Sequence, residues 1–282
     1  MNIEHLVQQA IEGNKSALEG VIAAIQDDIY YLSLRMLANP DDAKDATQEI
    51  LIRIITKLST FQFQSQFKTW AYRVASNFLI TEKKKFSNHS ELTFDIFKAD
   101  LESDLQDPAA LRQHPQYNAM LSELRVSCTF SMLLCLNSAH RMAYILGDIF
   151  EMEHQQASEI LSITKANFRQ QLSRARTKIV AFTTNNCGLV SSCAQCRCDK
   201  KLTGAIARQR VNSDQIRFTS DKDMTYREIK QRLSETQESL RTLTLQQAHA
   251  DYKCPIEFGE IIESLVMDNI DKQYTTTPKS IN

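Results

Sequence analysis

The sequence predicts an all-α protein with two small helical domains, a linker between them and a mainly helical C-terminal extension. Only six Gly and five Pro interrupt 282 residues, and the period-two alternation typical of strands is scarce. Apolar residues instead recur at helical spacing through most of the chain. With 43% hydrophobic and 24% charged residues, the composition is that of a globular protein long enough for two or three small cores.

The first domain, residues 5–86, is predicted to begin with two amphipathic helices. An apolar stripe at helical spacing forms the first, which Pro40 ends. Asp41 or Asp42 is placed to cap the second helix, which runs from about residue 43 to 58. Its predicted core positions are Ala46, Ile50, Ile54 and Leu58.

A third helix follows the break "STFQFQSQ", with Phe67 and Phe78 on its inner stripe. From there the helical period fades, acids outnumber bases, and Pro108 and Pro115 punctuate the chain. We expect residues 87–116 to be a linker with only transient helix.

The second domain, residues 117–182, opens with two apolar helical segments separated near Asn137, where Ser138 is placed to cap the second. A helix-turn-helix follows. Its first helix is predicted from about His154 to Leu161, its turn at Ser162–Ile163, and its second helix after the cap Thr164. The inner face of that second helix comprises Phe168, Leu172, Ala175 and Ile179.

The opposite face of the second helix is polar, basic and free of acids. Arg and Gln match base edges in the major groove of DNA, and Lys matches phosphates. A solvated basic face on a structural helix is the alternative, but the capped turn and the correct buried set favour DNA. The predicted duplex-binding residues are Thr164, Lys165, Asn167, Arg169, Gln170, Ser173, Arg174 and Arg176.

Charge is segregated along the chain although the formal net charge is only −1. Residues 160–210 hold ten Lys or Arg and the single acid Asp199, whereas residues 221–271 hold eleven acids and six bases. The extension, residues 183–282, reads as two acidic amphipathic helices, 226–243 and 255–270, around Cys254. One hypothesis is that they cover the basic DNA-reading face; dimerisation and simple structural support are the alternatives.

The stretch "DDAKDATQEILIRIITKLSTFQFQSQFKTWAYRVASNFLITEKKK" resembles the second conserved region of bacterial RNA polymerase sigma factors of the extracytoplasmic-function (ECF) branch. The stretch "LNSAHRMAYILGDIFEMEHQQASEILSITKANFRQQLSRARTKI" resembles their fourth region. Together the two matches cover about residues 5–182, so the domains become sigma region 2 and sigma region 4. Lys165 and the pair Gln170–Gln171 depart from the family's commonest pattern, which leaves the recognised base sequence open.

The resemblance implies partners for particular residues. Core RNA polymerase would be bound through its β′ clamp and β flap, and promoter DNA through both regions; an anti-sigma factor is left open. The residues that would meet the β′ clamp are Asp45, Gln48, Glu49, Ile52 and Arg53. Opened strands need aromatic surfaces for stacking and cations for the backbone. The residues that would hold the melted promoter are Phe61, Gln62, Phe63, Gln64, Ser65, Lys68, Trp70, Arg73 and Asn77.

Cysteines concentrate after the helix-turn-helix, in "NNCGLVSSCAQCRCDKKL". Four thiolates can complete a tetrahedral zinc site, and the predicted metal ligands are Cys187, Cys193, Cys196 and Cys198, with Cys254 as a substitute for one of them. A thiol redox switch and plain reduced thiols are the alternatives. Seven Cys in total, an odd number, fit a reducing compartment.

The sequence therefore predicts a sigma factor that directs core polymerase to specific promoters, promotes strand opening and starts transcription. The alternatives are a stand-alone helix-turn-helix regulator and a sensory interaction protein acting through its Cys-rich tail. No nucleophile, carboxylate pair or phosphate loop is assembled, so we expect no enzyme activity. No run of the sequence is apolar enough to span a bilayer and no secretory signal is recognisable, so we expect a cytoplasmic protein with no membrane partner.

Overall fold

The computed structural model describes residues 2–81, 92–212, 214–219, 223–248 and 252–259. Within these residues the fold is helical, and the only β pairing is two isolated bridges, Cys187 with Cys196 and Asn212 with Gln215. The predicted all-α class is therefore confirmed. None of the described helices combines the length and apolarity needed to cross a membrane.

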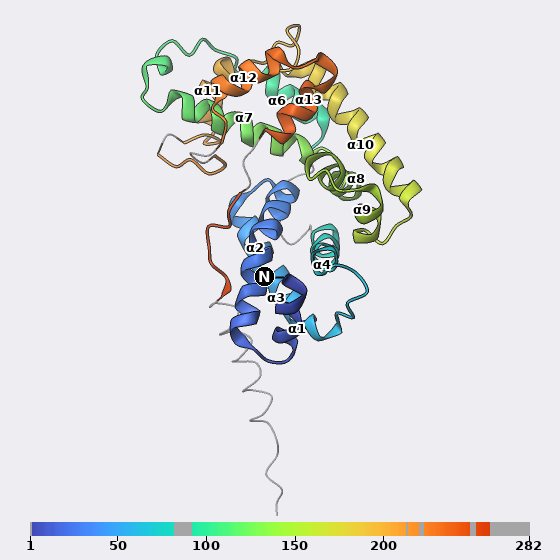
Figure 1. The fold of residues 1–282 in the computed structure, drawn as a ribbon. Helices are drawn as coiled ribbons and strands as arrows, with labels where there is room; N and C mark the ends of the chain where they lie inside the picture. The colour runs from blue at the N-terminus through green and yellow to red at the C-terminus, as the bar shows by residue number, and fades with distance from the viewer. Residues whose placement is uncertain (1, 82–91, 213, 220–222, 249–251, 260–282) are drawn as a thin grey trace, which may run out of the picture.

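Figure 1 shows two lobes, with α1–α4 in one and α6–α13 in the other. The first lobe contains α1 (Ile3–Ile11), α2 (Lys15–Leu37), α3 (Pro40–Thr56), the 3-10 turn η1 (Leu58–Thr60) and α4 (Phe67–Thr81). All four predicted core positions of the second helix are buried, as are Phe67 and Phe78. The cap of α3 differs from the prediction. The Asn39 side chain accepts from the Asp41 and Asp42 backbone N–H groups, and Pro40 occupies the first helical turn, where a missing N–H costs nothing.

The second lobe contains α6 (Phe94–Glu102), η2 (Leu111–Gln113), α7 (Tyr117–Leu134), α8 (Ser138–Tyr144), the π-helical turn η3 (Ile145–Ile149), α9 (His154–Ile160), α10 (Lys165–Asn186), α11 (Cys198–Ala207), α12 (Tyr226–Glu235) and α13 (Glu238–Gln247). The cap of α8 is Asn137, whose side chain accepts from the His140 N–H, rather than Ser138. The predicted single helix over 226–243 is two helices, since the backbone is extended at Thr236. Most of the predicted helix 255–270 lies outside the described residues.

The predicted linker contains a docked helix. Phe97 stacks on Phe182 of α10 with ring centroids 5.5 Å apart, and Phe94 lies 5.0 Å from the same ring. The Asp100 carboxylate accepts from Arg208 at 2.6 Å and from Arg210 at 2.5 Å. These partners are distant in sequence, which is why the local pattern did not predict a stable helix here.

Three arginines are buried: Arg35 on α2, Arg125 on α7 and Arg141 on α8. The Arg141 guanidinium donates to the Leu133, Leu134 and Leu136 carbonyls at the end of α7, and to the Met36 carbonyl near the end of α2 at 2.5 Å. The partial negative charge of two helix C-termini thus offsets its charge. Burial nevertheless lowers the pKa of Arg141 to about 10. This side chain joins the two lobes.

Candidate nucleic-acid interface

The helix-turn-helix forms as the sequence predicts. Helix α9 ends at Ile160, the turn places Ser162 at a φ of 54°, and the Thr164 side chain accepts from the Asn167 N–H at 3.2 Å. This N-cap satisfies one of the free donors at the start of α10. Helix α10 therefore begins where the sequence predicts.

The inner face of α10 is fully packed. Phe168, Leu172, Ala175 and Ile179 are all buried. Gly147 in η3 allows α10 to approach closely, because a Cβ there would lie 2.8 Å from Cδ2 of Leu172. The predicted inward set is confirmed, and it fixes the rotation of the helix.

That rotation leaves all eight predicted duplex-binding residues exposed. The Arg169 Nε donates to His154 Nδ1 across the turn at 3.4 Å, and the His154 ring packs on Phe168 with centroids 5.5 Å apart. Arg174 projects from the next turn of the same face. An exposed, acid-free row of cations and amides on one helix is able to contact both base edges and phosphates.

Arg176 differs from Arg169 and Arg174 because it is paired with a carboxylate. Its guanidinium forms a two-point ion pair with Asp148 of η3, with N–O distances of 2.9 and 2.5 Å. Hydrogen bonding to Asp148 is the main cause of the raised pKa of Arg176. Asp148 itself is only 5% exposed. Arg176 therefore anchors α10 to η3, a role that the sequence alone does not indicate because the pairing with Asp148 depends on tertiary packing.

The nine residues predicted to hold the melted promoter lie along one loop and one helix, but they are not equally accessible. Gln62, Gln64, Lys68 and Asn77 are exposed and Ser65 is half-buried. Phe63 is 43% exposed and has a φ of 56°, a left-handed conformation that is costly for a bulky residue. This strained turn directs an aromatic ring outward.

Phe61, in contrast, is buried at the centre of an aromatic group. Its ring lies 4.7 Å from Phe63, 5.6 Å from Phe67 and 5.5 Å from Trp70, measured between centroids. It supports the exposed ring of Phe63 rather than presenting its own face.

The two cations of this predicted surface already have protein partners. Lys68 forms an ion pair with Asp28 at 2.8 Å. The Arg73 Nε donates to the Glu159 carbonyl of α9 at 3.1 Å. The surface therefore touches the helix-turn-helix.

The predicted polymerase-binding residues share the outer side of α3. Asp45 and Arg53 are exposed, and Gln48, Glu49 and Ile52 are half-buried. The Arg53 guanidinium also lies over the Phe78 ring, 4.6 Å from its centroid. A half-buried apolar residue within a charged face is common in protein interfaces.

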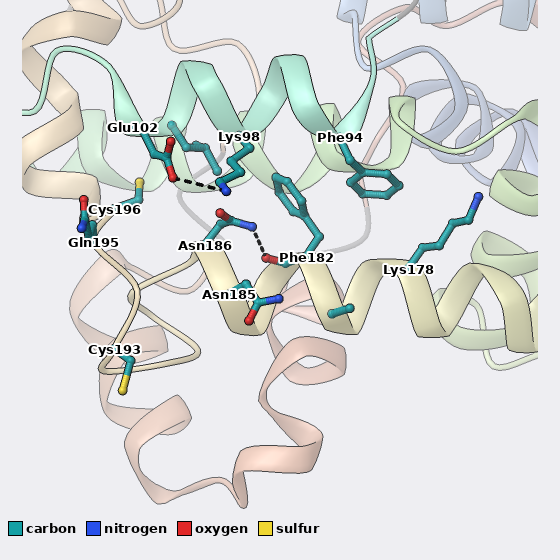
Figure 2. A pocket seen from close by; sticks show the side chains of 12 residues that line it. Phe94, Lys98, Glu102, Lys178, Phe182, Asn185, Asn186, Cys193, Gln195 and Cys196 are labelled. Carbon is teal, nitrogen blue, oxygen red and sulfur yellow. Dashed lines mark hydrogen bonds and ion pairs between the residues drawn. The ribbon is translucent and has the colours of Figure 1, made fainter.

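The four predicted metal ligands do not form one site in the described residues, although the thiols of Cys187, Cys196 and Cys198 lie near enough to affect one another's ionisation. Cys187 and Cys196 are paired by a backbone bridge, and Cys198 begins α11. Cys193 is exposed, and Figure 2 shows its side chain pointing away from Cys196, which lies on the same loop, residues 187–197. This loop lines a cleft of about 600 Å³ together with α6 and α10. Cys254 instead packs against α2, where its backbone N–H donates to the Asp27 side chain.

No three His, Cys, Asp or Glu side chains in the described part of the chain are arranged to hold a metal ion. The residues present do not fit the predicted zinc site, so zinc remains a prediction without geometric support. Burial, the largest effect, raises the pKa of Cys196 to about 11 and raises those of Cys187 and Cys198.

Comparisons with known proteins agree with this geometry. The family model "Sigma-70 region 2" matches residues 21–87 and the model "Sigma-70, region 4" matches residues 129–179. The ECF RNA polymerase sigma factor SigW of Bacillus subtilis is 28% identical over 177 residues, which are 62% of this chain and 94% of that protein. The ECF RNA polymerase sigma-E factor of Haemophilus influenzae is 25% identical over 178 residues, 62% of this chain and 91% of that protein.

A solved structure, CnrH in complex with the cytosolic domain of CnrY, matches at 18% identity and a TM-score of 0.42, covering 62% of this chain and 93% of that one. The two matched regions end at residue 179. The C-terminal extension with its cysteines lies beyond them.

Proposed function

The chain belongs to the ECF sigma factors of RNA polymerase, and we propose that it directs core polymerase to specific promoters, promotes strand opening and so starts transcription. It carries out no covalent chemistry of its own, as expected for this family. Promoter DNA and core polymerase are its partners.

The observation that carries the proposal is the outer face of α10. Eight exposed polar or basic residues stand on a helix whose rotation is fixed by a capped turn and a buried inner face. We propose that Arg169 and Gln170 read base edges and that Lys165 contacts phosphate. Arg176 supports them through Asp148.

For region 2 we propose that the exposed ring of Phe63 and the loop residues Gln62 and Gln64 hold an unstacked base, supported by the buried Phe61. Stacking on an aromatic ring is worth about 1–3 kcal/mol per base. We further propose that Asp45 and Arg53 on α3 meet the β′ clamp and that region 4 meets the β flap. An anti-sigma factor remains a further candidate partner, and the cytoplasm the proposed location.

Run-off transcription tests the proposal. The full chain is mixed with core RNA polymerase and a promoter library, and the start sites are mapped. Specific start sites that disappear when Arg169 and Arg174 are both changed to Glu support a sigma factor. Footprints on duplex DNA without polymerase, together with no specific transcripts, would instead support a stand-alone regulator.

A further inference from the structure

The helix predicted to hold the melted strand is packed against the helix-turn-helix. Besides the Arg73 bond to Glu159, the Gln156 side chain of α9 donates to the Thr69 hydroxyl of α4 at 3.3 Å. The Ser76 hydroxyl of α4 lies 3.6 Å from the Met142 sulfur of α8. Helix α9 therefore occupies the side of α4 that carries Arg73.

The C-terminal extension binds the first lobe through an extended segment, residues 252–258, which we call the strap. Figure 1 shows it running beside α2. The Cys254 N–H donates to Asp27 at 2.8 Å and the Phe258 N–H to Gln26 at 3.2 Å, while the Gln26 amide donates to Glu257 at 2.7 Å.

The strap also has apolar anchors. Phe258 is 1% exposed and belongs to the main buried cluster. The Tyr252 ring lies 5.3 Å from Tyr31 of α2 and 5.9 Å from Phe130 of α7, so one ring contacts both lobes.

The end of α13 is held from both lobes by buried arginines. Arg35 of α2 donates to the Gln246 carbonyl at 2.9 Å, and Arg125 of α7 donates to the Ala248 carbonyl at 3.1 Å. Both guanidinium groups have further partners, since Arg35 donates to the Tyr31 hydroxyl at 2.6 Å and Arg125 to the Met224 carbonyl at 3.3 Å. Because a buried charge is stabilised by its hydrogen bonds, removing this carbonyl end would cost each arginine one of them.

We propose that the C-terminal extension, through the strap and the end of α13, holds the two lobes in a closed form in which α9 covers the Arg73 side of the strand-binding helix. Binding of an opened promoter strand at Arg73 then requires the lobes to separate. This inference rests on the proposed function, because it assigns strand binding to α4. It adds that the chain carries its own inhibitory contact.

The effect on strand affinity depends on the fraction of molecules that are in the closed form. The apparent affinity for a strand is the affinity of the open form multiplied by the open fraction. If the closed form outnumbers the open form by about ten to one, full release of the strap tightens strand binding by about tenfold.

The test uses the full chain with Tyr252→Ala and Phe258→Ala together, which removes both apolar anchors. A second variant, Gln26→Ala with Asp27→Ala, removes the polar contacts from the other side. Leu240→Ala is the matched control, because Leu240 lies in the same extension but is 50% exposed. The radius of gyration is measured by small-angle X-ray scattering, and affinity for a short labelled single-stranded DNA of random sequence by fluorescence anisotropy.

We expect both strap variants to have a larger radius of gyration and tighter strand binding, with unchanged helical circular dichroism, and the control to behave as the unmodified chain. An unchanged radius in both strap variants overturns the role of the strap. A larger radius with unchanged affinity overturns the covering of α4. If no form binds single-stranded DNA, the proposed strand binding by α4 fails instead, and the radius alone still decides whether the strap closes the molecule.

Discussion

The three arginines of α10 have different surroundings, which indicate that they have different roles. Arg169 and Arg174 are exposed on the outer face, whereas Arg176 is paired with the buried Asp148. The sequence predicted all three as DNA ligands because helical spacing places them on the same side. It could not identify Asp148 as a partner, since that pairing depends on how η3 packs on α10.

Replacing Arg169 or Arg174 with Ala is expected to lower promoter affinity by about 1–3 kcal/mol each if the side chain reads a base. The measurement is binding of the reconstituted holoenzyme to a promoter found in the run-off screen. Thr177→Ala is the control, an exposed substitution on the same helix. Equal affinities for all three variants would contradict the assignment of the outer face.

Glu123 gives the fold a pH dependence. This buried carboxylate accepts from the Arg217 N–H at 2.8 Å and the Phe218 N–H at 3.0 Å. Burial is the largest effect and raises its pKa above the ordinary 4.5, although these hydrogen bonds lower it in part. Because the folded pKa is above the unfolded one, the stabilising contribution is complete below the unfolded pKa and is lost as pH rises through the folded pKa.

Glu123→Gln is therefore expected to remove this loss. The free energy of unfolding, from urea titrations at pH values from about 4.5 to neutral, should fall less with rising pH in the variant than in the unmodified chain. Glu238→Gln, at an exposed site, is the control. A parallel pH dependence for Glu123→Gln and the unmodified chain would contradict the account.

At the level of helices, local pattern predicted the elements whose signals are local. The stripes of α3 and α10, the Thr164 cap and the turn after α9 follow from spacing and capping chemistry within a few residues. The cap of α3 was placed two or three residues late and the cap of α8 one residue late, because Asn39 and Asn137 are followed closely by other residues that cap equally well. In the structure, Asn39 and Asn137 have the extended backbone conformation of an N-cap, and the residues that follow them are already helical.

Helix α6 was not predicted because its stability comes from distant residues. Phe182→Ala removes the ring on which Phe94 and Phe97 pack and is expected to destabilise the protein by about 3–5 kcal/mol. Thermal unfolding and hydrogen exchange of residues 94–102 measure this. Phe63→Ala, which removes a ring that is 43% exposed, should change stability far less; equal losses would show that α6 does not depend on Phe182.

The surroundings of the seven cysteines predict the order in which their thiols react. Cys193 is the exposed thiol among the seven, and burial raises the pKa of Cys128, Cys135, Cys187, Cys196, Cys198 and Cys254. Thiolates react and thiols do not, so iodoacetamide at neutral pH should label Cys193 first in the folded protein. Peptide mass spectrometry reads the order, and Cys193→Ser supplies the control; early labelling of Cys196 or Cys198 would contradict the packing.

For the whole molecule, composition and periodicity predicted the helical class and the resemblance to sigma factors predicted the two regions in order, but neither predicted how the lobes and the extension pack together. The acidic extension does not cover the basic face in the described residues, since Lys165 to Arg176 keep their exposure. It instead contacts α7 and α2 through backbone carbonyls and an extended strap, and extended segments carry no periodic signal. Most of the second predicted acidic helix lies outside the described residues, so the covering of the basic face by that helix stays a prediction.

The arrangement of the cysteines leads to a prediction about the metal content of the whole chain. Because the predicted ligands are not gathered within the described residues, elemental analysis of protein purified without chelator is expected to find far less than one zinc per chain. A cadmium-supplemented preparation serves as a comparison for adventitious thiol binding. Stoichiometric zinc that survives dialysis would restore the four-thiolate assignment.

Trp70 is the one tryptophan of the sequence, and it packs against Phe61 and Phe67 beside the strained loop. Indole emission from this chain therefore originates at a single place, on the helix that also carries Arg73. Excitation in the near ultraviolet gives a built-in optical reporter of events at α4, with no dye attached and none of the seven thiols consumed.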